Sequence, residues 1–279
     1  MSSMNEQALK ERVRNIAQAQ GRTFNNVWQE VLLERWLVRL VASKYSENFV
    51  FKGAMCLVQY LELDRETRDL DFLVKGIEVS LKDITSYLNE VCSIDLKDGF
   101  TFVDLEVGTL EHTHMKYPGH AVSVWGVMGN TKTKIFIDIG VGDTVSPTQI
   151  TMELIGLKTK PLFEKDLHIW AYPVESIFAE KLETAISRGD QNSRMKDFHD
   201  LLAISRSGLL NISKSQSAIA ATFSNRGTIL QQIAFDENLD RYWKQYFKSL
   251  TEENSKKLPM NINDVIEELN QFLKLKKLI

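Results

Sequence analysis

The stretch that decides the fold is Arg68-Asp69-Leu70-Asp71-Phe72-Leu73-Val74. Its alternation predicts a β-strand over residues 69–74, because alternate side chains of a strand share a face. Asp69 and Asp71 then point to one side, and the apolar residues pack on the other. Two carboxylates a few ångströms apart repel each other unless a cation lies between them, and Mg²⁺ prefers such hard oxygen ligands. An Asp-x-Asp pair is also common on a solvated edge strand, so the motif alone leaves that alternative open.

A second motif precedes the acidic strand. In Phe51-Lys52-Gly53-Ala54 a short strand ends at Gly53 and a helix is expected to begin. Backbone N–H groups at the start of a helix bind phosphate, and a glycine lets a phosphate approach the main chain closely. A plain strand-to-helix turn explains the same residues. A pair of metal-binding acids after a phosphate-binding turn is nevertheless more specific than either motif alone.

A third carboxylate lies further along the chain. Asp138 interrupts an apolar strand predicted over residues 132–140, and it shares a strand face with Lys134 and Phe136. It is either a third metal ligand or a polar residue on an exposed sheet face. Asp143, just beyond, is expected in a turn after Gly142.

A lysine occupies the apolar side of a predicted helix over residues 174–188. At about 100° per residue Lys181 falls inside the apolar arc, whereas Glu180 and Glu183 fall outside it. A buried lysine is costly unless it meets a counter-charge. Lys181 therefore either reaches out past the helix edge or points at phosphates or at the acidic cluster.

Asp197 lies in the first turn of the next predicted helix, over residues 194–206, which Ser193 is expected to cap. Its place at the edge of the apolar stripe allows it to pair with a nearby arginine, to orient Lys181 or to act as a base. A first-turn acid that complements the helix dipole is the simpler interpretation.

The remaining pattern predicts an α+β protein: a mixed β-sheet flanked by helices, followed by a helical C-terminal bundle. We place the domains at residues 1–165 and 166–279. Strands are expected over residues 49–51, 100–108, 120–127, 132–140 and 168–172, with an irregular stretch around 147–166. A Gly129-Asn130 turn is expected to join the strands over 120–127 and 132–140. Helices are expected over residues 6–20, 25–44, 54–62, 79–91, 174–187, 194–206, 213–222, 227–233, 239–250 and 262–275.

Composition and charge exclude several classes of protein. The 279 residues carry 34 Lys and Arg against 37 Asp and Glu, a net charge of −3, which argues against a broad basic surface for nucleic acid. No apolar run reaches the length of a membrane span, and the polar N-terminus does not resemble a signal peptide. Two distant cysteines and the histidine spacing give no zinc motif. We therefore expect a cytoplasmic protein without a membrane partner.

Taken in order, several segments resemble the AbiEii/AbiGii toxin family, nucleotidyltransferases of the DNA polymerase β superfamily that include the MenT toxins. The segments that carry the resemblance are Phe51-Lys52-Gly53-Ala54-Met55, Arg65-Glu66-Thr67-Arg68-Asp69-Leu70-Asp71, Phe136-Ile137-Asp138-Ile139-Gly140-Val141-Gly142-Asp143, Tyr172-Pro173-Val174-Glu175, Ala179-Glu180-Lys181-Leu182-Glu183 and residues 192–200. They span roughly residues 49–206 in the family's order.

The resemblance implies a nucleotidyltransferase-type sheet, Mg²⁺ at Asp69 and Asp71, and functional roles for Thr67, Lys181 and Asp197. It also implies an antitoxin encoded beside the protein and an RNA acceptor such as tRNA. Asp138 fits the superfamily's third carboxylate. Two departures stand out: Gly53-Ala54 replaces the usual Gly-Gly or Gly-Ser, and Thr67 stands where many members have serine.

Our hypothesis from the sequence is Mg²⁺-dependent nucleotidyl transfer from an NTP to an acceptor, RNA or protein. The catalytic residues would be Asp69, Asp71, Lys181 and Asp197, the metal ligands Asp69, Asp71 and Asp138, and the nucleotide contacts Lys52, Gly53, Ala54, Thr67, Arg68 and Lys181. The alternative is a module that binds an NTP or a protein without turnover. A haloacid-dehalogenase-type phosphatase would need an apolar strand before Asp69, and residues 65–68 are polar.

Overall fold

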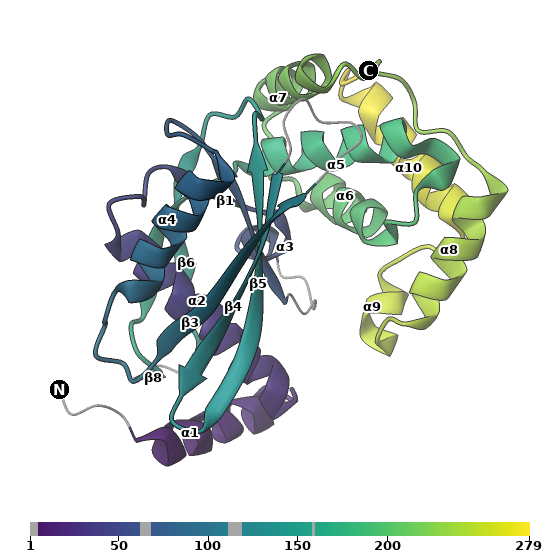
Figure 1. The fold of residues 1–279 in the computed structure, drawn as a ribbon. Helices are drawn as coiled ribbons and strands as arrows, with labels where there is room; N and C mark the ends of the chain where they lie inside the picture. Colours follow the sequence, from purple (N-terminus) through teal and green to yellow (C-terminus); the bar gives the residue numbers. More distant parts are fainter. Residues whose placement is uncertain (1–4, 62–67, 111–118, 158–159) are drawn as a thin grey trace. The chain divides into compact units, whose positions relative to one another are not determined.

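The computed structural model describes residues 5–61, 68–110, 119–157 and 160–279 (Figure 1). Within these residues one mixed sheet of seven strands has the order β3-β4-β5-β2-β1-β9-β6, and β7 pairs with β8. The strands are β1 (Phe49–Lys52), β2 (Asp69–Val74), β3 (Thr101–Leu110), β4 (Gly119–Met128), β5 (Thr131–Val141), β6 (Thr148–Glu153), β7 (Gly156–Leu157), β8 (Lys160–Pro161) and β9 (Asp166–Ala171). The helices are α1 (Glu6–Ala19), α2 (Phe24–Ala42), α3 (Gly53–Leu57), α4 (Leu81–Ser93), α5 (Val174–Arg188), α6 (Met195–Ser207), α7 (Ile212–Arg226), α8 (Glu237–Lys248), α9 (Glu252–Lys256) and α10 (Ile262–Leu275).

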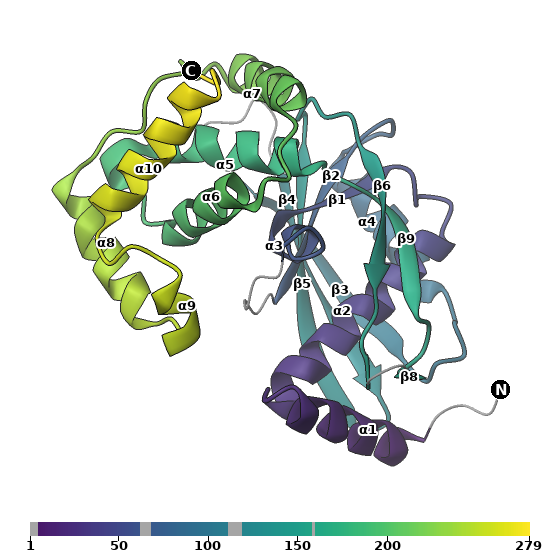
Figure 2. The same ribbon diagram turned by 180° about the vertical axis from the view of Figure 1, so that it is seen from behind.

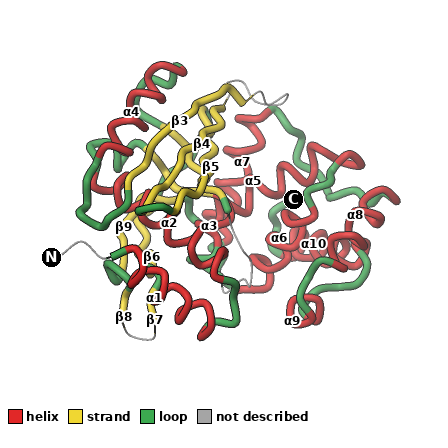
Figure 3. The backbone as a smooth tube through the Cα atoms, turned by 60° about the horizontal axis from the view of Figure 1, so that its bottom comes forward, coloured by secondary structure: helices red, strands yellow, loops and turns green. Residues whose placement is uncertain are grey.

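The chain forms two compact units. The described parts of residues 1–59, 65–142 and 147–171 make the sheet unit, and the described parts of 60–64, 143–146 and 172–279 make the helical unit. In Figure 3 the C-terminal segments are helices joined by loops. The α+β class with a mixed sheet is confirmed, whereas the domain boundary after residue 165 stays a prediction. In the described part of the chain, no helix is both long and apolar enough to span a bilayer.

The long β4–β5 hairpin is positioned by its turn. Gly129 adopts a positive φ of 56°, which favours glycine, and Asn130 follows it, as the sequence predicts for a tight hairpin. The carboxylate of Glu6, in the first turn of α1, accepts hydrogen bonds from the Asn130 N–H (3.1 Å) and the Thr131 hydroxyl (2.7 Å). Helix α1 therefore holds the tip of the hairpin.

Helix α2 covers one face of the sheet (Figure 2). Most of its side chains are therefore buried. A β-carbon added to Gly126 on β4 would lie 2.5 Å from Leu32 Cδ2 of α2, so the glycine allows the helix to approach the strand. Ile135, Ile137 and Ile139 of β5 are buried on the helix-covered face. The alternate residues of β5 lie on the opposite face of the sheet, which we call the open face.

The structure corrects several predicted elements. Residues 148–153, in the stretch predicted to be irregular, form β6, because they pair in full register with β9. The helix predicted over 227–233 is wrong: α7 continues to Arg226, and Gly227 ends it with a φ of 68°. Helix α3 ends at Leu57, short of residue 62, and α9 was not foreseen. Arg194, and not Ser193, occupies the N-cap position of α6, and it makes no side-chain capping hydrogen bond.

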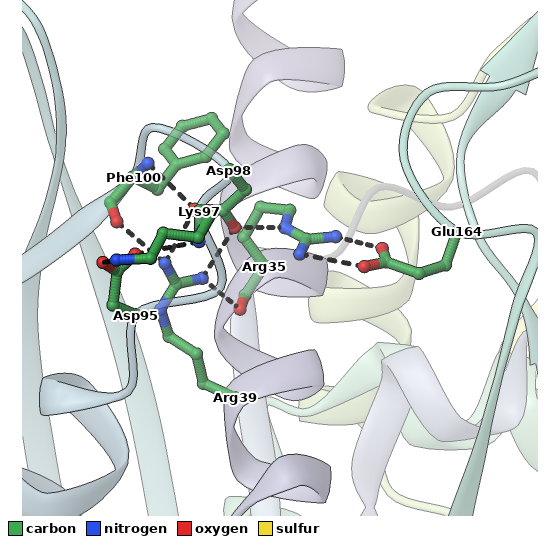
Figure 4. Close-up of polar contacts among 7 residues, drawn as sticks. All are labelled: Arg35, Arg39, Asp95, Lys97, Asp98, Phe100 and Glu164. Atoms are coloured by element: carbon green, nitrogen blue, oxygen red, sulfur yellow. Dashed lines mark hydrogen bonds and ion pairs between the residues drawn. The ribbon is translucent and has the colours of Figure 1, made fainter. Parts of the chain in front are cut away.

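A buried charged cluster joins α2 to the loop before β3 (Figure 4). Asp98 accepts from Arg35 Nε at 2.7 Å and from both terminal nitrogens of Arg39 at 2.9 Å. Arg39 also donates to the Phe100 carbonyl, and Arg35 pairs with Glu164. Burial disfavours the Asp98 anion, but its arginine partners, Arg39 above all, outweigh burial and lower the pKa of that carboxyl.

Removal of Asp98 should destabilise the protein severely, because Asp98→Ala leaves Arg39 buried without its counter-charge. We expect the free energy of unfolding to fall by about 3–5 kcal/mol, measured by urea denaturation. The matched control is Asp95→Ala, which removes an exposed carboxylate paired with Lys97 and should leave the midpoint nearly unchanged. Equal midpoints for the two variants would contradict this assignment.

A second buried acid of α2 predicts a pH dependence. Both oxygens of Glu34 lie 3.0 Å from the Ile155 N–H, and only 4% of the residue is exposed. Burial raises the pKa of Glu34 well above its ordinary value of 4.5. The folded state then binds a proton more tightly than the unfolded state does. The contribution of Glu34 to stability therefore falls as pH rises above 4.5.

The variant Glu34→Gln keeps an amide oxygen for the Ile155 N–H and removes the titration. Above pH 4.5 we expect its stability to rise relative to wild type as pH rises, by up to about 1.4 kcal/mol per pH unit. The exposed Glu47 of the sheet unit provides the control Glu47→Gln. A constant difference between Glu34→Gln and wild type over this range would show that Glu34 titrates normally.

Candidate functional site

The acidic motif lies on β2 as the sequence predicts. Leu70 and Phe72 are fully buried, while Asp69 is exposed and Asp71 is half-buried. The alternation of burial along the strand confirms that the two acids share the side of the sheet away from the core. Solvent-accessible carboxylates on a rigid strand can bind a ligand without a rearrangement of the core.

The pairing of β2 with β5 brings Asp138 to the same place in the sheet. The two strands run parallel, with Asp71 opposite Asp138 and Asp69 opposite Phe136. Side chains opposite each other in neighbouring strands lie on the same face, so the three acids share the open face. Among the described residues, no group of three or more His, Cys, Asp or Glu side chains is arranged to hold a metal ion. The role of Asp138 as a third ligand stays a prediction.

The turn at Gly53 packs against this acidic motif. Gly53 has a φ of 72°, and a β-carbon there would lie 2.7 Å from Asp71 Cβ and would collide with its carboxylate. The preceding residue, Lys52, stands opposite Asp71 in the β1–β2 pair. Lys52 Nζ would lie 3.8 Å from a β-carbon on Gly140, two residues past Asp138. The predicted strand-to-helix turn is confirmed, and it places a cation beside the acids.

The other residues predicted to contact the nucleotide are Ala54, Thr67 and Arg68. Ala54 is half-buried in the first turn of α3, a helix of five residues. Arg68 is exposed immediately before β2, and its carbonyl accepts from Gln29 Nε2 at 3.5 Å. Thr67 lies outside the described residues. The structure therefore places Lys52, Gly53 and Ala54 beside the acidic strand and positions Arg68 at its start.

Lys181 lies in the helical unit and points inward, as the helical projection predicts. Its side chain is 13% exposed, and Nζ lies 2.7 Å from Asp197 Oδ1 and 2.8 Å from Asp200 Oδ2. Arg194 Nε lies 3.1 Å from the other oxygen of Asp197. Burial disfavours the charged lysine, but the two aspartates outweigh burial and raise the pKa of Lys181. The ammonium is therefore charged at neutral pH.

Sequence reasoning missed Asp200, although its side chain is 1% exposed and its carboxylate lies 2.8 Å from Lys181 Nζ. The sequence contained the signal for Asp200, because this residue follows Asp197 by three positions and residues three apart lie on one face of a helix. Asp197 is thus more than a first-turn acid that complements the dipole. Its carboxylate binds both Lys181 and Arg194.

A second ion cluster corrects the helical projection of α5. Glu183, predicted outside the apolar arc, is buried and pairs with Arg226 of α7 at 2.8 Å. Arg226 also pairs with Glu180 at 2.9 Å and with Asp143 at 3.3 Å, and Tyr172 donates to Asp143. The prediction failed because α5 packs against α7 with a charged side, which an apolar arc does not reveal. Burial disfavours the charged guanidinium, but these carboxylates outweigh that effect and raise the pKa of Arg226.

Loss of Lys181 should affect stability as well as activity. Lys181→Ala leaves the buried Asp197 and Asp200 without their shared cation, and we expect a loss of about 3–5 kcal/mol in urea denaturation. Because the folded pKa of Lys181 is raised, this contribution is fully present below pH 10.5 and is lost only as pH rises through the folded value. The exposed Lys196 on α6, the helix that carries Asp197 and Asp200, provides the control Lys196→Ala. A similar loss in both variants would show that the pairing contributes little.

Comparison with known proteins gives a family and a fold. Residues 35–273 match the sequence model of a family described as the nucleotidyl transferase AbiEii toxin of a type IV toxin–antitoxin system. A crystal structure of a candidate nucleotidyltransferase from H. pylori is similar, with a TM-score of 0.51 and 16% identity over 91% of this chain and 95% of that chain. JHP933 from Helicobacter pylori aligns with a TM-score of 0.47 and 14% identity over 91% and 96% of the two chains. No curated protein matches the sequence closely enough to count as a relative.

Proposed function

The chain belongs to the AbiEii family of nucleotidyltransferase toxins from type IV toxin–antitoxin systems, and we propose that it transfers a nucleotide from an NTP to an RNA acceptor with Mg²⁺ as its cofactor. The observation that carries the proposal is the register of β2 and β5, which puts Asp69, Asp71 and Asp138 on one face of the sheet. The family membership supplies the class of reaction, and the residues on this face supply the chemistry.

The donor set fits Mg²⁺. This ion is commonly held by one or two carboxylates together with water and substrate phosphates, so Asp69 and Asp71 suffice as ligands. We assign Asp138 as a third, auxiliary ligand because it stands opposite Asp71. When bound, the ion would neutralise the negative charge of the triphosphate.

The turn at Gly53 would orient the phosphates. Its backbone lies against the Asp71 side chain, because the glycine has no β-carbon to collide with that carboxylate. Backbone N–H groups of Gly53 and Ala54 can donate to phosphate oxygens, and Lys52 adds a positive charge on the same face. We assign Thr67 and Arg68 as further nucleotide contacts, on the basis of the family motif.

Lys181 would contact the triphosphate or the leaving pyrophosphate. The proposal rests on the family motif and on the charge of its buried ammonium. Asp197 and Asp200 fix the position of this cation from two sides, at 2.7 and 2.8 Å. We therefore assign Asp197 the main role of orienting Lys181. Its additional role would be that of a base toward the acceptor.

The acceptor and the partners follow from the family. Membership of a type IV toxin–antitoxin family implies an antitoxin partner and an NTP substrate. We propose RNA, tRNA in particular, as the acceptor, and the cytoplasm as the place of action. The net charge of −3 restricts RNA contacts to a local region of the surface.

Substitution of the acids tests the reaction. Asp69→Asn and Asp71→Asn should each reduce transfer of label from an α-³²P-NTP to total RNA by at least about 100-fold, because each variant loses a carboxylate proposed to hold Mg²⁺. Each of the four NTPs is supplied in turn with Mg²⁺. The control Asp95→Asn, an exposed acid of the sheet unit, should transfer at the wild-type rate.

Full activity of Asp69→Asn or Asp71→Asn would contradict the assignment of the acids. Calorimetry of the wild-type protein distinguishes nucleotidyl transfer from the alternative, which is binding of an NTP without turnover. If Mg-NTP binds but no pyrophosphate is released with any RNA acceptor, the chain is a binding module that does not turn over.

A further inference from the structure

The open face of the sheet continues beyond the acids with an exposed aromatic ring. Phe136 is 52% exposed, stands opposite Asp69 and lies two residues before Asp138 on β5. Burial alternates along β5, so Lys132, Lys134, Phe136 and Asp138 all lie on this face. A large apolar ring beside carboxylates has no role in packing the core, where the isoleucines of β5 are buried.

A second aromatic side chain extends the same surface. Trp125 of β4 stands opposite Lys134 in the hairpin. Nζ of Lys132 lies 4.8 Å and Nζ of Lys134 lies 5.7 Å from the Trp125 ring centroid, within the range of cation–π attraction. The ring therefore holds two ammonium groups together on the open face.

Both lysines also pair with carboxylates of β3. Lys132 lies 2.7 Å from Asp104, and Lys134 lies 3.1 Å from Glu106. Because Asp104 and Glu106 are largely exposed, these pairs are weak and are screened by salt. A phosphate can therefore compete for the two ammonium groups without the cost of breaking a buried pair.

The length of this surface indicates the size of its ligand. A strand rises about 3.3 Å per residue, so Asp138 and Lys132 lie roughly 20 Å apart along β5. One nucleotide of a stacked strand advances only about 3.4 Å. A stacked strand of about six nucleotides therefore spans the distance from Asp138 to Lys132.

We propose that the unpaired end of the acceptor RNA lies along β5, with a base stacked on Phe136 and with phosphates at Lys132 and Lys134. The inference rests on the proposed function, since it assumes a polynucleotide acceptor. Base stacking on an aromatic ring combined with a cationic surface along the backbone is the usual chemistry of single-strand binding. The exposed bases of a single strand can reach Phe136, whereas the bases of a duplex are stacked on each other.

The first test measures binding without chemistry. A short fluorescein-labelled single-stranded RNA is titrated with the full-length protein, without NTP, and followed by anisotropy. Phe136→Ala should bind roughly tenfold more weakly, and Phe136→Trp should bind like wild type. The matched control is Phe235→Ala, because Phe235 is 48% exposed and lies in the helical unit. A thermal midpoint equal to that of wild type verifies that each variant is folded.

The second test addresses the lysines. The double variant Lys132→Ala/Lys134→Ala should bind the RNA more weakly, and its slope of log affinity against log salt should be shallower by about 0.7 for each lost phosphate contact. Lys44→Ala is the matched control, because Lys44 also lies over an aromatic ring, Tyr45, and pairs with an exposed carboxylate, Glu90.

Steady-state kinetics separate this inference from the proposed function. Phe136→Ala should raise the KM for the RNA acceptor and leave the KM for the NTP unchanged. The inference would be overturned by any of three results: a raised KM for the NTP alone, wild-type RNA affinity in Phe136→Ala, or equal binding of single-stranded and duplex RNA. In each of these cases, transfer by the wild-type protein would still support the proposed function. RNA binding that depends on Phe136, without any transfer, would support the inference and contradict the proposed function.

Discussion

The parallel pairing of β2 with β5 is the constraint on which the rest of the site depends. A shift of this register by one residue would turn Asp138 away from Asp71 and would expose isoleucines in its place. The register is held because alternate residues of both strands are buried beneath α2. The same apolar alternation that stabilises the sheet thus brings the carboxylates together, so the core and the site cannot vary independently.

Buried charge is the second theme of the structure, and each unit contains its own example. In the sheet unit Asp98 binds two arginines of α2. In the helical unit Lys181 lies between Asp197 and Asp200. Each pairing offsets a large desolvation cost only when its geometry is complete. These clusters therefore fix the orientation of helices, and loss of one partner is expected to affect folding before it affects chemistry.

The open face reconciles the acidic composition with a polynucleotide acceptor. Its acids and its lysines are separated along β5, so the proposed metal ligands and the proposed phosphate contacts lie toward opposite ends of one strand. A protein with a net charge of −3 does not need a broad basic surface if a few local contacts position a single-stranded end. The proposed surface is an ordered part of the sheet and is not a loop, which favours a fixed distance between the reacting end and its anchoring contacts.

Much of the fold was predictable from the sequence alone. The strand over 69–74, the hairpin around Gly129-Asn130 and the inward lysine of α5 follow from local periodicity and turn chemistry. The motifs also indicated the family, since their order and residue types are specific. The failures, such as β6 and the absent helix at 227–233, occurred where the local pattern is weak and a partner strand or a single glycine decided the outcome.

The sequence by itself indicated the residues that we propose for the chemistry: two acids with strand spacing, a glycine turn before them and a lysine among apolar neighbours. Only the tertiary structure decided which residues meet. Asp138 stands opposite Asp71 because of a pairing between strands far apart in the chain. Asp200 joins Lys181 because α5 packs on α6, and Phe136 is exposed opposite Asp69 because of the register between β5 and β2. Register and packing are long-range properties, and no local pattern encodes them.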